Sequence, residues 1–454
     1  MGNSLKTLIA LTIAAVTAVL VPESELLDPA ARRALFILIF AALLWMSDAM
    51  PAFSVGILVI ALKLLLLGKA GGVYATTTRD WEDFVAVLGH PLVWLFFGGF
   101  VLAAGMAATG IDRWLANRIL KKFGGSSGQL LSGLMLATFG LSMIMSNTAT
   151  TAMMLAILAP LLTNKKGTTT AKALVLGVAV AANLGGMGSL IGTPPNAIAV
   201  GTLLETPNGP EIGFLDWMIV GLPPALTLLA LSWIIIRLTY KLDDSPLVLP
   251  DMEVRDIVIP RWQTLTVVAT LAVTVGLWLT SELHRAPTAV ISFIPIVLFT
   301  TTGILTTQRI RGLPYDVLFM LAGGLALGQT VADTGLSLWI ADLLPAGDIA
   351  PVFIVLLFAY LTVVLSNFMS NTAAATVLIP ISLTVAKSFP GVIAITVALA
   401  ASAAMLLPVA TPPNAMAFAS GHLETRDFVR LGTVIGLLAP AAVIGWLSIV
   451  LAFI

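Results

Sequence analysis

The sequence predicts an all-α polytopic membrane protein made of two inverted repeats, each with a re-entrant helical hairpin and a broken helix. Two observations indicate this fold class. First, 58% of the 454 residues are hydrophobic and only 10% are charged, whereas soluble proteins average about 25% charged residues. Second, apolar runs recur along the whole chain. Because a helix needs ~20 residues to cross a bilayer, the runs leave room for about ten to twelve crossing elements.

Residues 1–30 are expected to form an N-terminal helix and loop. Lys6 precedes an apolar run that ends at Val21. The stretch Val16–Ala18 loosely resembles a signal-peptidase site, so a cleaved leader is an alternative. A polytopic chain inserts without a removable signal, and we therefore expect the first helix to be retained.

The placement of basic residues predicts the orientation, because Lys and Arg collect in the cytoplasmic loops of membrane proteins. With the N-terminus inside, most of the 23 Lys and Arg residues fall on the cytoplasmic side. Segments 204–216 and 333–350 contain acids but no Lys or Arg, as external loops would. Lys63 lies within a span, and its long side chain is expected to carry the ammonium group to the membrane surface. The net charge is zero, so nothing favours nucleic acid as a partner.

Three features recur in the same order in both halves of the chain: a Gly-Gly pair, a motif S-x-x-x-S-N-T, and a motif T-P-P-N. This recurrence predicts a duplication, with repeats at 31–240 and 262–454 and a cytoplasmic linker at 241–261. The charge distribution places the flanks of the first S-N-T inside and those of the second outside. The repeats are therefore predicted to be inverted, as in many secondary transporters.

The S-N-T motifs are predicted to lie at the tips of re-entrant hairpins, at about 126–163 and 349–386. Basic clusters precede and follow the first motif, so the chain is expected to enter and leave on one side of the membrane. As a helix, Thr151–Leu162 rises only ~18 Å and cannot cross a ~30 Å hydrocarbon core. A single such motif is more often a simple turn, but two paired motifs in matching places indicate a site.

The two T-P-P-N motifs are predicted to break helices. Pro194 and Pro195 cannot donate hydrogen bonds to the carbonyls four residues back, and Pro412 and Pro413 cannot either. The freed carbonyls, together with Ser and Asn oxygens, would make a neutral oxygen cage that suits a small alkali cation. The helix N-termini that follow each break favour an anionic group.

Charged side chains are missing from the segments that contain the motifs, at 129–162, 185–200, 351–380 and 400–415. An anion bound there would need co-bound cations, which favours sodium coupling over plain exchange or proton-driven transport. The missing carboxylates argue against a proton relay or a divalent-metal site. The apolar segments contain no nucleophile–base pair, HExxH motif or carboxylate dyad, so an enzyme is not expected. An ion channel would more naturally show a continuous polar stripe.

These paired motifs resemble those of the divalent anion/sodium symporter family, the INDY-type dicarboxylate transporters. The resemblance extends from about residue 30 to the end of the chain. It implies a homodimer of eleven-helix protomers. We expect the protein in the cell inner (plasma) membrane, with the N-terminus in the cytoplasm as the basic residues indicate. It also implies a scaffold region and a mobile transport region that carries substrate by an elevator-type movement.

The resemblance also implies site residues, carried over motif by motif. One sodium ion would be held by Ser142, Ser146, Asn147 and backbone around Gly192. A second would be held by Ser366, backbone near Met369, Asn371 and backbone around Ala410. The substrate carboxylates would be held by the two S-N-T tips and the threonines beside them: Ser146, Asn147, Thr148, Thr193, Ser370, Asn371, Thr372 and Thr411. The second half reads A-T-P-P-N where the first reads G-T-P-P-N, and backbone oxygens would serve in either case.

We therefore expect sodium-coupled symport of C4-dicarboxylates such as succinate, malate and fumarate. The sodium ions are co-transported, the partners are the dicarboxylate anion and the lipid bilayer, and no catalytic residue is implied. Alternatives with the same fold are a sodium-independent dicarboxylate exchanger and a sodium-coupled sulfate or citrate transporter.

Overall fold

The structure is a computed structural model that describes most of the chain. The described residues are 2–22, 24, 26–69, 77, 79–123, 125–162, 167–206, 209–242, 260–343, 350–386 and 388–452. The regular elements within these ranges are all helices, and no strand occurs among them. The predicted all-α fold is therefore confirmed. Residues 243–259, which make up most of the predicted linker 241–261, lie outside the described part.

The helices form two compact units, and each unit is assembled from three separate segments of the chain. The first unit comprises Met1–Val93, Pro194–Glu211 and Pro314–Ala401, and the second comprises Trp94–Thr193, Ile212–Leu313 and Ser402–Ile454. Each unit therefore combines parts of both predicted repeats. The units reflect packing, so the repeat boundaries 31–240 and 262–454 remain predictions.

The first unit contains helices from the N-terminus, the middle and the second half of the sequence. They are α1 (Asn3–Leu20), α2 (Pro29–Ser47), α3 (Ala52–Lys63) with a π-helical turn at Leu64–Gly68, α4 (Trp81–Val85) with a 3₁₀ turn at Ala86–Gly89, α10 (Pro194–Leu204), α17 (Tyr315–Asp333), α18 (Leu336–Asp342), α19 (Pro351–Ser366), α20 (Asn371–Val385) and most of α21 (Pro390–Ala403).

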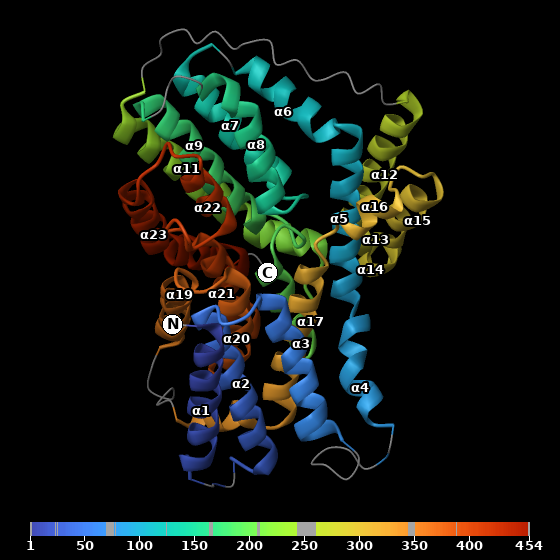
Figure 1. The fold of residues 1–454 in the computed structure, drawn as a ribbon, viewed down its shortest axis with the longest axis vertical. Helices are drawn as coiled ribbons and strands as arrows, with labels where there is room; N and C mark the ends of the chain where they lie inside the picture. Colours follow the sequence, from blue (N-terminus) through green and yellow to red (C-terminus); the bar gives the residue numbers. More distant parts are fainter. Residues whose placement is uncertain are drawn as a thin grey trace. The chain divides into compact units, whose positions relative to one another are not determined.

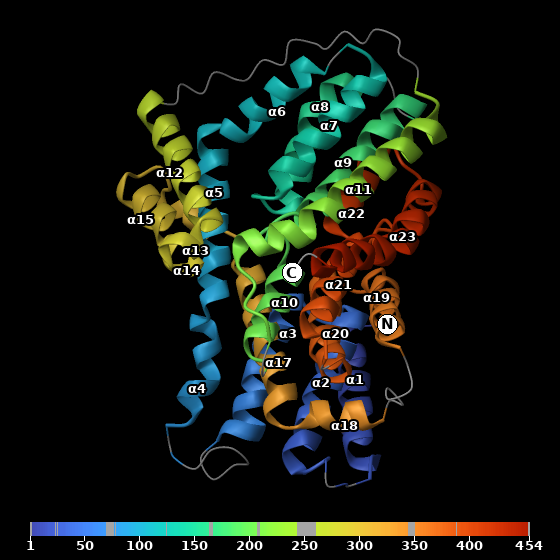
Figure 2. The ribbon, with the colours of Figure 1, turned by 180° about the vertical axis from the view of Figure 1, so that it is seen from behind.

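The second Gly-Gly pair allows close helix packing in the first unit. Helix α3 lies against α17 (Figures 1 and 2), and a Cβ atom added to Gly323 would collide with the backbone of Gly56. On Gly324, an added Cβ would lie 2.8 Å from the Thr376 hydroxyl of α20. Helix α17 also contacts α10, so the first Pro-Pro helix packs in the same unit as the second S-N-T motif.

The second unit contains the first S-N-T motif and the C-terminal helices. Its helices are most of α5 (Pro91–Thr109), α6 (Ile111–Lys122), α7 (Ser127–Ser142), α8 (Asn147–Leu162), α9 (Thr169–Met187), α11 (Phe214–Tyr240), α12 (Arg261–Leu279), α13 (Ser281–His284), α14 (Thr288–Ile291), α15 (Phe293–Thr301), α16 (Thr307–Arg311), α22 (Pro412–Ala419) and α23 (Thr425–Ala452).

Helix α9 is the core of the second unit. Of its most apolar window, 89% is buried, more than in any other candidate membrane span of the described chain. It packs against α7, α8, α11 and α22, and Figure 1 shows α7 and α8 beside it. The Nε1 atom of Trp217 in α11 donates a hydrogen bond of 3.1 Å to the Met187 carbonyl at the end of α9. The helices on either side of the first S-N-T motif, α7 and α8, therefore pack on the same central helix as α11 and α22.

Eight helices of the described chain are long and apolar enough to cross a membrane, which makes this a multi-pass membrane protein. Six further apolar helices are shorter, and they include α8, α19 and α20, which flank the S-N-T motifs. Helix α8 has 16 residues and begins at Asn147, so it is longer than the predicted Thr151–Leu162. Such a helix rises ~24 Å, which is still short of the ~30 Å core. The count of eleven membrane helices remains a prediction.

Candidate functional site

Three oxygen atoms meet at the first S-N-T motif. Helix α7 ends at Ser142 and α8 begins at Asn147. The fully buried Ser142 Oγ lies 2.7 Å from Asn147 Oδ1 and 2.8 Å from the Ala182 carbonyl oxygen of α9. Ser146, in the break, accepts a hydrogen bond of 3.2 Å from the Ala149 amide in the first turn of α8.

The second S-N-T motif repeats this arrangement within the first unit. Helix α19 ends at Ser366 and α20 begins at Asn371. The buried Ser366 Oγ lies 2.8 Å from Asn371 Oδ1 and 3.0 Å from the Ala401 carbonyl oxygen of α21. Ser370 caps α20 by accepting a 3.2 Å hydrogen bond from the Ala373 amide. We call each set of hydroxyl, amide and carbonyl oxygens an oxygen triad.

Each oxygen triad brings three neutral polar groups together. The serine hydroxyl lies within hydrogen-bond distance of an asparagine side-chain amide and of a backbone carbonyl oxygen. Hydroxyl, amide and carbonyl oxygens are neutral ligands of the kind that hard cations bind. The donor set therefore fits a small alkali cation.

Glycines bring the backbone after α9 close to the first triad. Helix α9 ends at Met187, and the next helix, α10, begins at Pro194. A Cβ atom added to Gly192 would lie 2.5 Å from the Gly186 carbonyl oxygen, and one added to Gly186 would lie 2.8 Å from Asn147 Oδ1. The structure thus gathers the predicted sodium ligands Ser142, Asn147 and Gly192 around one helix.

Both predicted helix breaks are present, but the prolines act differently from the expectation. Pro194 begins α10 and Pro412 begins α22. At the first positions of a helix the missing N–H would have no intrahelical partner in any case, so these prolines start helices and do not interrupt them. Thr411 caps α22 by accepting a 3.2 Å hydrogen bond from the Asn414 amide.

Each S-N-T motif lies across the start of a helix, with its serine in the break and its asparagine and threonine in the helix. Asn147 and Thr148 lie in the first turn of α8, and Asn371 and Thr372 lie in the first turn of α20. The break itself is at 143–146 and 367–370. Each motif therefore presents a helix N-terminus, where free amide groups and the helix dipole favour a carboxylate.

Comparison with known proteins identifies the family. A citrate transporter family (CitMHS) matches residues 5–403. This chain belongs to the citrate transporter family. It is 31% identical over 447 residues to a protein of Staphylococcus saprophyticus named sodium-dependent dicarboxylate transporter SdcS, covering 90% of this chain and 84% of that protein. It is 30% identical over 459 residues, with the same coverage, to the SdcS of a bovine Staphylococcus aureus strain.

The fold is similar to a solved transporter structure. The match is to the YdaH transporter of Alcanivorax borkumensis, described as having an unusual topology, with a TM-score of 0.58 and 15% sequence identity. It covers 89% of this chain and 99% of that protein. The predicted resemblance to sodium-coupled anion transporters is thereby confirmed as a family membership, and the chain is a transporter, not an enzyme.

The remaining predicted residues of this citrate transporter family member lie at or beside the motifs. Thr148 is exposed, Thr193 and Thr372 are buried, and Met369 lies in the break before α20 with 7% of its side chain exposed. Ala410 and Thr411 belong to the second unit, whereas Ser366, Met369 and Asn371 belong to the first. The grouping of Ala410 with the second triad therefore remains a prediction.

Sequence reasoning missed three contributors to this region. The carbonyls of Ala182 and Ala401 complete the oxygen triads, and a backbone oxygen leaves no residue-type signal. Asn183 follows Ala182, is 1% exposed, and donates hydrogen bonds of 3.1 Å to Thr411 Oγ1 and to Asn414 Oδ1. The signal that could have found them is a further repeat, Ala-Ala-Asn at 181–183 and Ala-Ala-Ser at 400–402.

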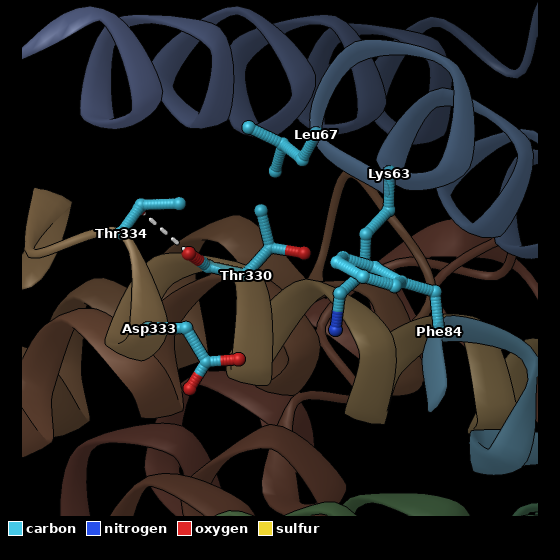
Figure 3. Close-up of a pocket in the computed structure, with 6 residues that line it drawn as sticks. All are labelled: Lys63, Leu67, Phe84, Thr330, Asp333 and Thr334. Atoms are coloured by element: carbon cyan, nitrogen blue, oxygen red, sulfur yellow. Dashed lines mark hydrogen bonds between the residues drawn. The ribbon is translucent and has the colours of Figure 1, made fainter. Parts of the chain in front are cut away.

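The expectation that Lys63 reaches the membrane surface is wrong. Its side chain is 5% exposed, and its Nζ donates a 3.2 Å hydrogen bond to Gln329 Oε1 and lies 5.1 Å from the centre of the Phe84 ring. These partners inside the first unit hold the ammonium group in place. Lys63 lines a cavity of about 210 Å³ together with Leu67, Phe84, Thr330, Asp333 and Thr334. Figure 3 shows these six side chains. None of the predicted site residues lines this cavity.

Charged groups are absent from both oxygen triads. No group of three or more His, Cys, Asp or Glu side chains that could hold a metal occurs in the described parts of the chain. The triads therefore offer neutral oxygens alone, and a cation bound there keeps its positive charge. That charge is then available to attract an anion at the adjacent helix N-termini.

Proposed function

We propose that this chain imports C4-dicarboxylates such as succinate, malate or fumarate by symport with sodium ions. The observation that carries the proposal is the matched pair of neutral oxygen triads at Ser142 and Ser366. Two neutral cation sites placed beside helix N-termini suit an anion that is carried together with cations. The names of the two staphylococcal relatives support the same cation and substrate class.

In this proposal the first sodium ion is held by Ser142, Ser146, Asn147 and backbone at Gly192, with the Ala182 carbonyl added. The second is held by Ser366, Asn371 and backbone at Met369 and Ala410, with the Ala401 carbonyl added. The substrate carboxylates are bound by the residues of the two S-N-T motifs and the threonines that precede the proline pairs: Ser146, Asn147, Thr148, Thr193, Ser370, Asn371, Thr372 and Thr411. The asparagines contact both cation and anion, which couples the two.

The remaining parts of the proposal concern the whole transporter. It works as a homodimer in the plasma membrane with the N-terminus in the cytoplasm, and a mobile transport region moves substrate by an elevator-type movement. The bias of Lys and Arg toward one side of the membrane supports the orientation. The inverted motif pattern supports alternating access.

Uptake into proteoliposomes tests the proposal. Purified protein is reconstituted, and labelled succinate uptake is compared under an inward sodium gradient and an equal inward potassium gradient. Saturable uptake that requires sodium is expected. Uptake that requires internal dicarboxylate and is indifferent to sodium would make the protein an exchanger, and the symport proposal would be wrong.

Citrate is a second candidate substrate because the matching family is described as a citrate transporter family. The neutral triads do not distinguish two carboxylates from three. Competition decides the question: unlabelled citrate, malate, fumarate and sulfate are each added to the succinate assay in sodium. We expect malate and fumarate to compete more strongly than citrate or sulfate, and the reverse order would replace the proposed substrate.

A further inference from the structure

Two adjacent residues of α9 contact both functional motifs in the second unit. The Ala182 carbonyl contacts Ser142 of the first oxygen triad, and the next side chain, Asn183, contacts Thr411 and Asn414 at the start of α22. Helix α22 also packs directly on α9. One turn of a buried helix therefore joins a cation site to a substrate-binding segment from the other half of the sequence.

The hydrogen bonds around Thr411 leave its hydroxyl proton available. Thr411 Oγ1 accepts hydrogen bonds from Asn183 Nδ2 at 3.1 Å and from the Asn414 amide at 3.2 Å, which uses both of its lone pairs. Within the described residues no acceptor is found for its own proton, and the side chain is only 2% exposed. A hydroxyl fixed in this way can donate to a substrate carboxylate without first breaking another bond.

Hydrogen bonds to the neighbouring Asn414 fix the orientation of its side-chain amide and that of Asn183. Its Nδ2 donates both protons to backbone, at 3.1 Å to the Met405 carbonyl and 3.0 Å to the Leu407 carbonyl, while its Oδ1 accepts from Asn183. Asn183 Nδ2 likewise donates both of its protons. In contrast, Asn183 Oδ1 is buried and has no hydrogen-bond partner in the described part of the structure.

We infer that Asn183 is a positioning residue that couples binding of the first sodium ion to binding of the substrate. This inference rests on the proposed function. Sodium held by the Ala182 carbonyl fixes the turn of α9 that carries Asn183. Asn183 then holds the Thr411 hydroxyl ready for a carboxylate. Coupling of this kind is reciprocal, so succinate strengthens sodium binding by the same factor.

Two substitutions test the coupling. Asn183→Ala removes both donors to α22, and Asn183→Ser keeps a small polar side chain, as found at Ser402 in the matching Ala-Ala-Ser of the second half. We expect Asn183→Ala to raise the succinate KM in saturating sodium by ~10-fold, within the ordinary 5- to 150-fold range of coupling between sites. The Hill coefficient for sodium should fall toward one. The succinate KM and the sodium Hill coefficient of Asn183→Ser should lie between those of Asn183→Ala and those of the wild type. Asn117→Ala on α6 is the matched control.

Thermal unfolding of the purified protein gives a readout that is independent of transport. In the wild type, sodium should raise Tm, and succinate should raise it further in the presence of sodium, because ligands stabilise the state that binds them. Asn183→Ala should keep the sodium increment, since Ser142, Asn147 and Ala182 are unchanged, and should lose most of the succinate increment. If this variant does not fold, Asn183→Ser is measured in its place.

Uptake and Tm of the wild type test the proposed function, and the same measurements on the Asn183 variants test the coupling role. A folded Asn183 variant with the wild-type succinate KM, sodium cooperativity and Tm increments would overturn the coupling role. Wild-type protein in which neither sodium nor succinate alters Tm, and in which uptake ignores sodium, would contradict the proposed function itself.

Discussion

Ser142 Oγ lies 2.7 Å from Asn147 Oδ1, and the same contact recurs at 2.8 Å between Ser366 and Asn371 in the other unit. The two residues of each pair are separated by a helix break, so regular helical geometry does not impose the contact. In both places an alanine carbonyl completes the oxygen triad. An arrangement that is built twice from distant parts of the chain indicates a shared chemical task, which we propose is cation binding.

Removing either serine hydroxyl should weaken sodium binding. For Ser142→Ala and Ser366→Ala we expect the sodium concentration for half-maximal succinate uptake to rise ~10- to 100-fold, because hydrogen bonds or ligands to a charged group are worth about 1.5–3 kcal/mol. Uptake is measured against sodium concentration in proteoliposomes. Ser132→Ala is the control, since within the described residues the Ser132 hydroxyl on α7 donates to the Gly128 carbonyl and contacts no triad group. Equal sodium dependence in all three variants would contradict the cation site.

Removing an S-N-T amide should weaken both ligands together. Asn147 and Asn371 supply a triad oxygen and also begin the helices that face the substrate in the proposal. Asn147→Ala and Asn371→Ala should therefore raise the half-maximal concentrations of sodium and of succinate, whereas a triad serine variant acts mainly on sodium. The measurement is a two-dimensional titration of uptake. If Asn147→Ala kept normal sodium-dependent succinate uptake, the site assignment would be wrong.

A methyl group at Gly186 should disturb the first triad without altering its ligands. The added Cβ of Gly186→Ala would lie 2.8 Å from Asn147 Oδ1 and 2.9 Å from Asn147 Nδ2, so the amide must rotate away from Ser142. We expect sodium affinity to fall by ~10-fold or more, as for loss of the ligand itself.

The control for this variant is Gly140→Ala on α7, where an added Cβ meets nothing within 4 Å. That change should keep sodium affinity and stabilise the protein slightly, by up to ~1 kcal/mol, because Ala has the higher helix propensity. Sodium titration and Tm of both variants are compared. Loss of sodium affinity in Gly140→Ala as well would mean that any added methyl is harmful, and the Gly186 argument would fail.

The sequence was sufficient to predict the fold class and the two motif regions, because apolar runs, polar insertions and proline pairs each have a direct physical cause. The grouping of Ser142 with Asn147 was implied by the family resemblance, and the structure places the two side chains in contact. The start of α8 at Asn147 was not predicted, because a helix can begin within a polar motif when a residue such as Ser146 caps it.

Other features depend on tertiary contacts that sequence spacing does not reveal. The Ala182 and Ala401 carbonyls are backbone atoms, and Asn183 meets Thr411 only because α22 packs on α9. The burial of Lys63 depends on Phe84 and Gln329, which come from other helices of the first unit. Which segments belong to each compact unit likewise depends on packing across the repeats, and no local sequence pattern predicts it.

The attachment of α9 to the segment before α23 should weaken in acid. Lys172 Nζ lies 2.9 Å from Glu424 Oε1 and 3.2 Å from Asp427 Oδ2. The hydrogen bond from Lys172 lowers the pKa of the Glu424 carboxyl below its ordinary value. A carboxyl whose pKa is lower in the folded state stabilises that state above the unfolded pKa, and the stabilisation is lost as the pH falls through the folded pKa.

The difference in Tm between wild type and Glu424→Gln should therefore be constant from neutral pH to about pH 5 and should shrink toward zero near about pH 3, below the ordinary carboxyl range. It should be small and should shrink in high salt, because Glu424 is exposed and surface ion pairs are screened. Glu282→Gln, another exposed glutamate of the second unit, is the control. A Tm difference that grows on acidification would show that Glu424 does not stabilise the fold through its charge, and the role of Lys172 would then rest on the buried Asp427 alone.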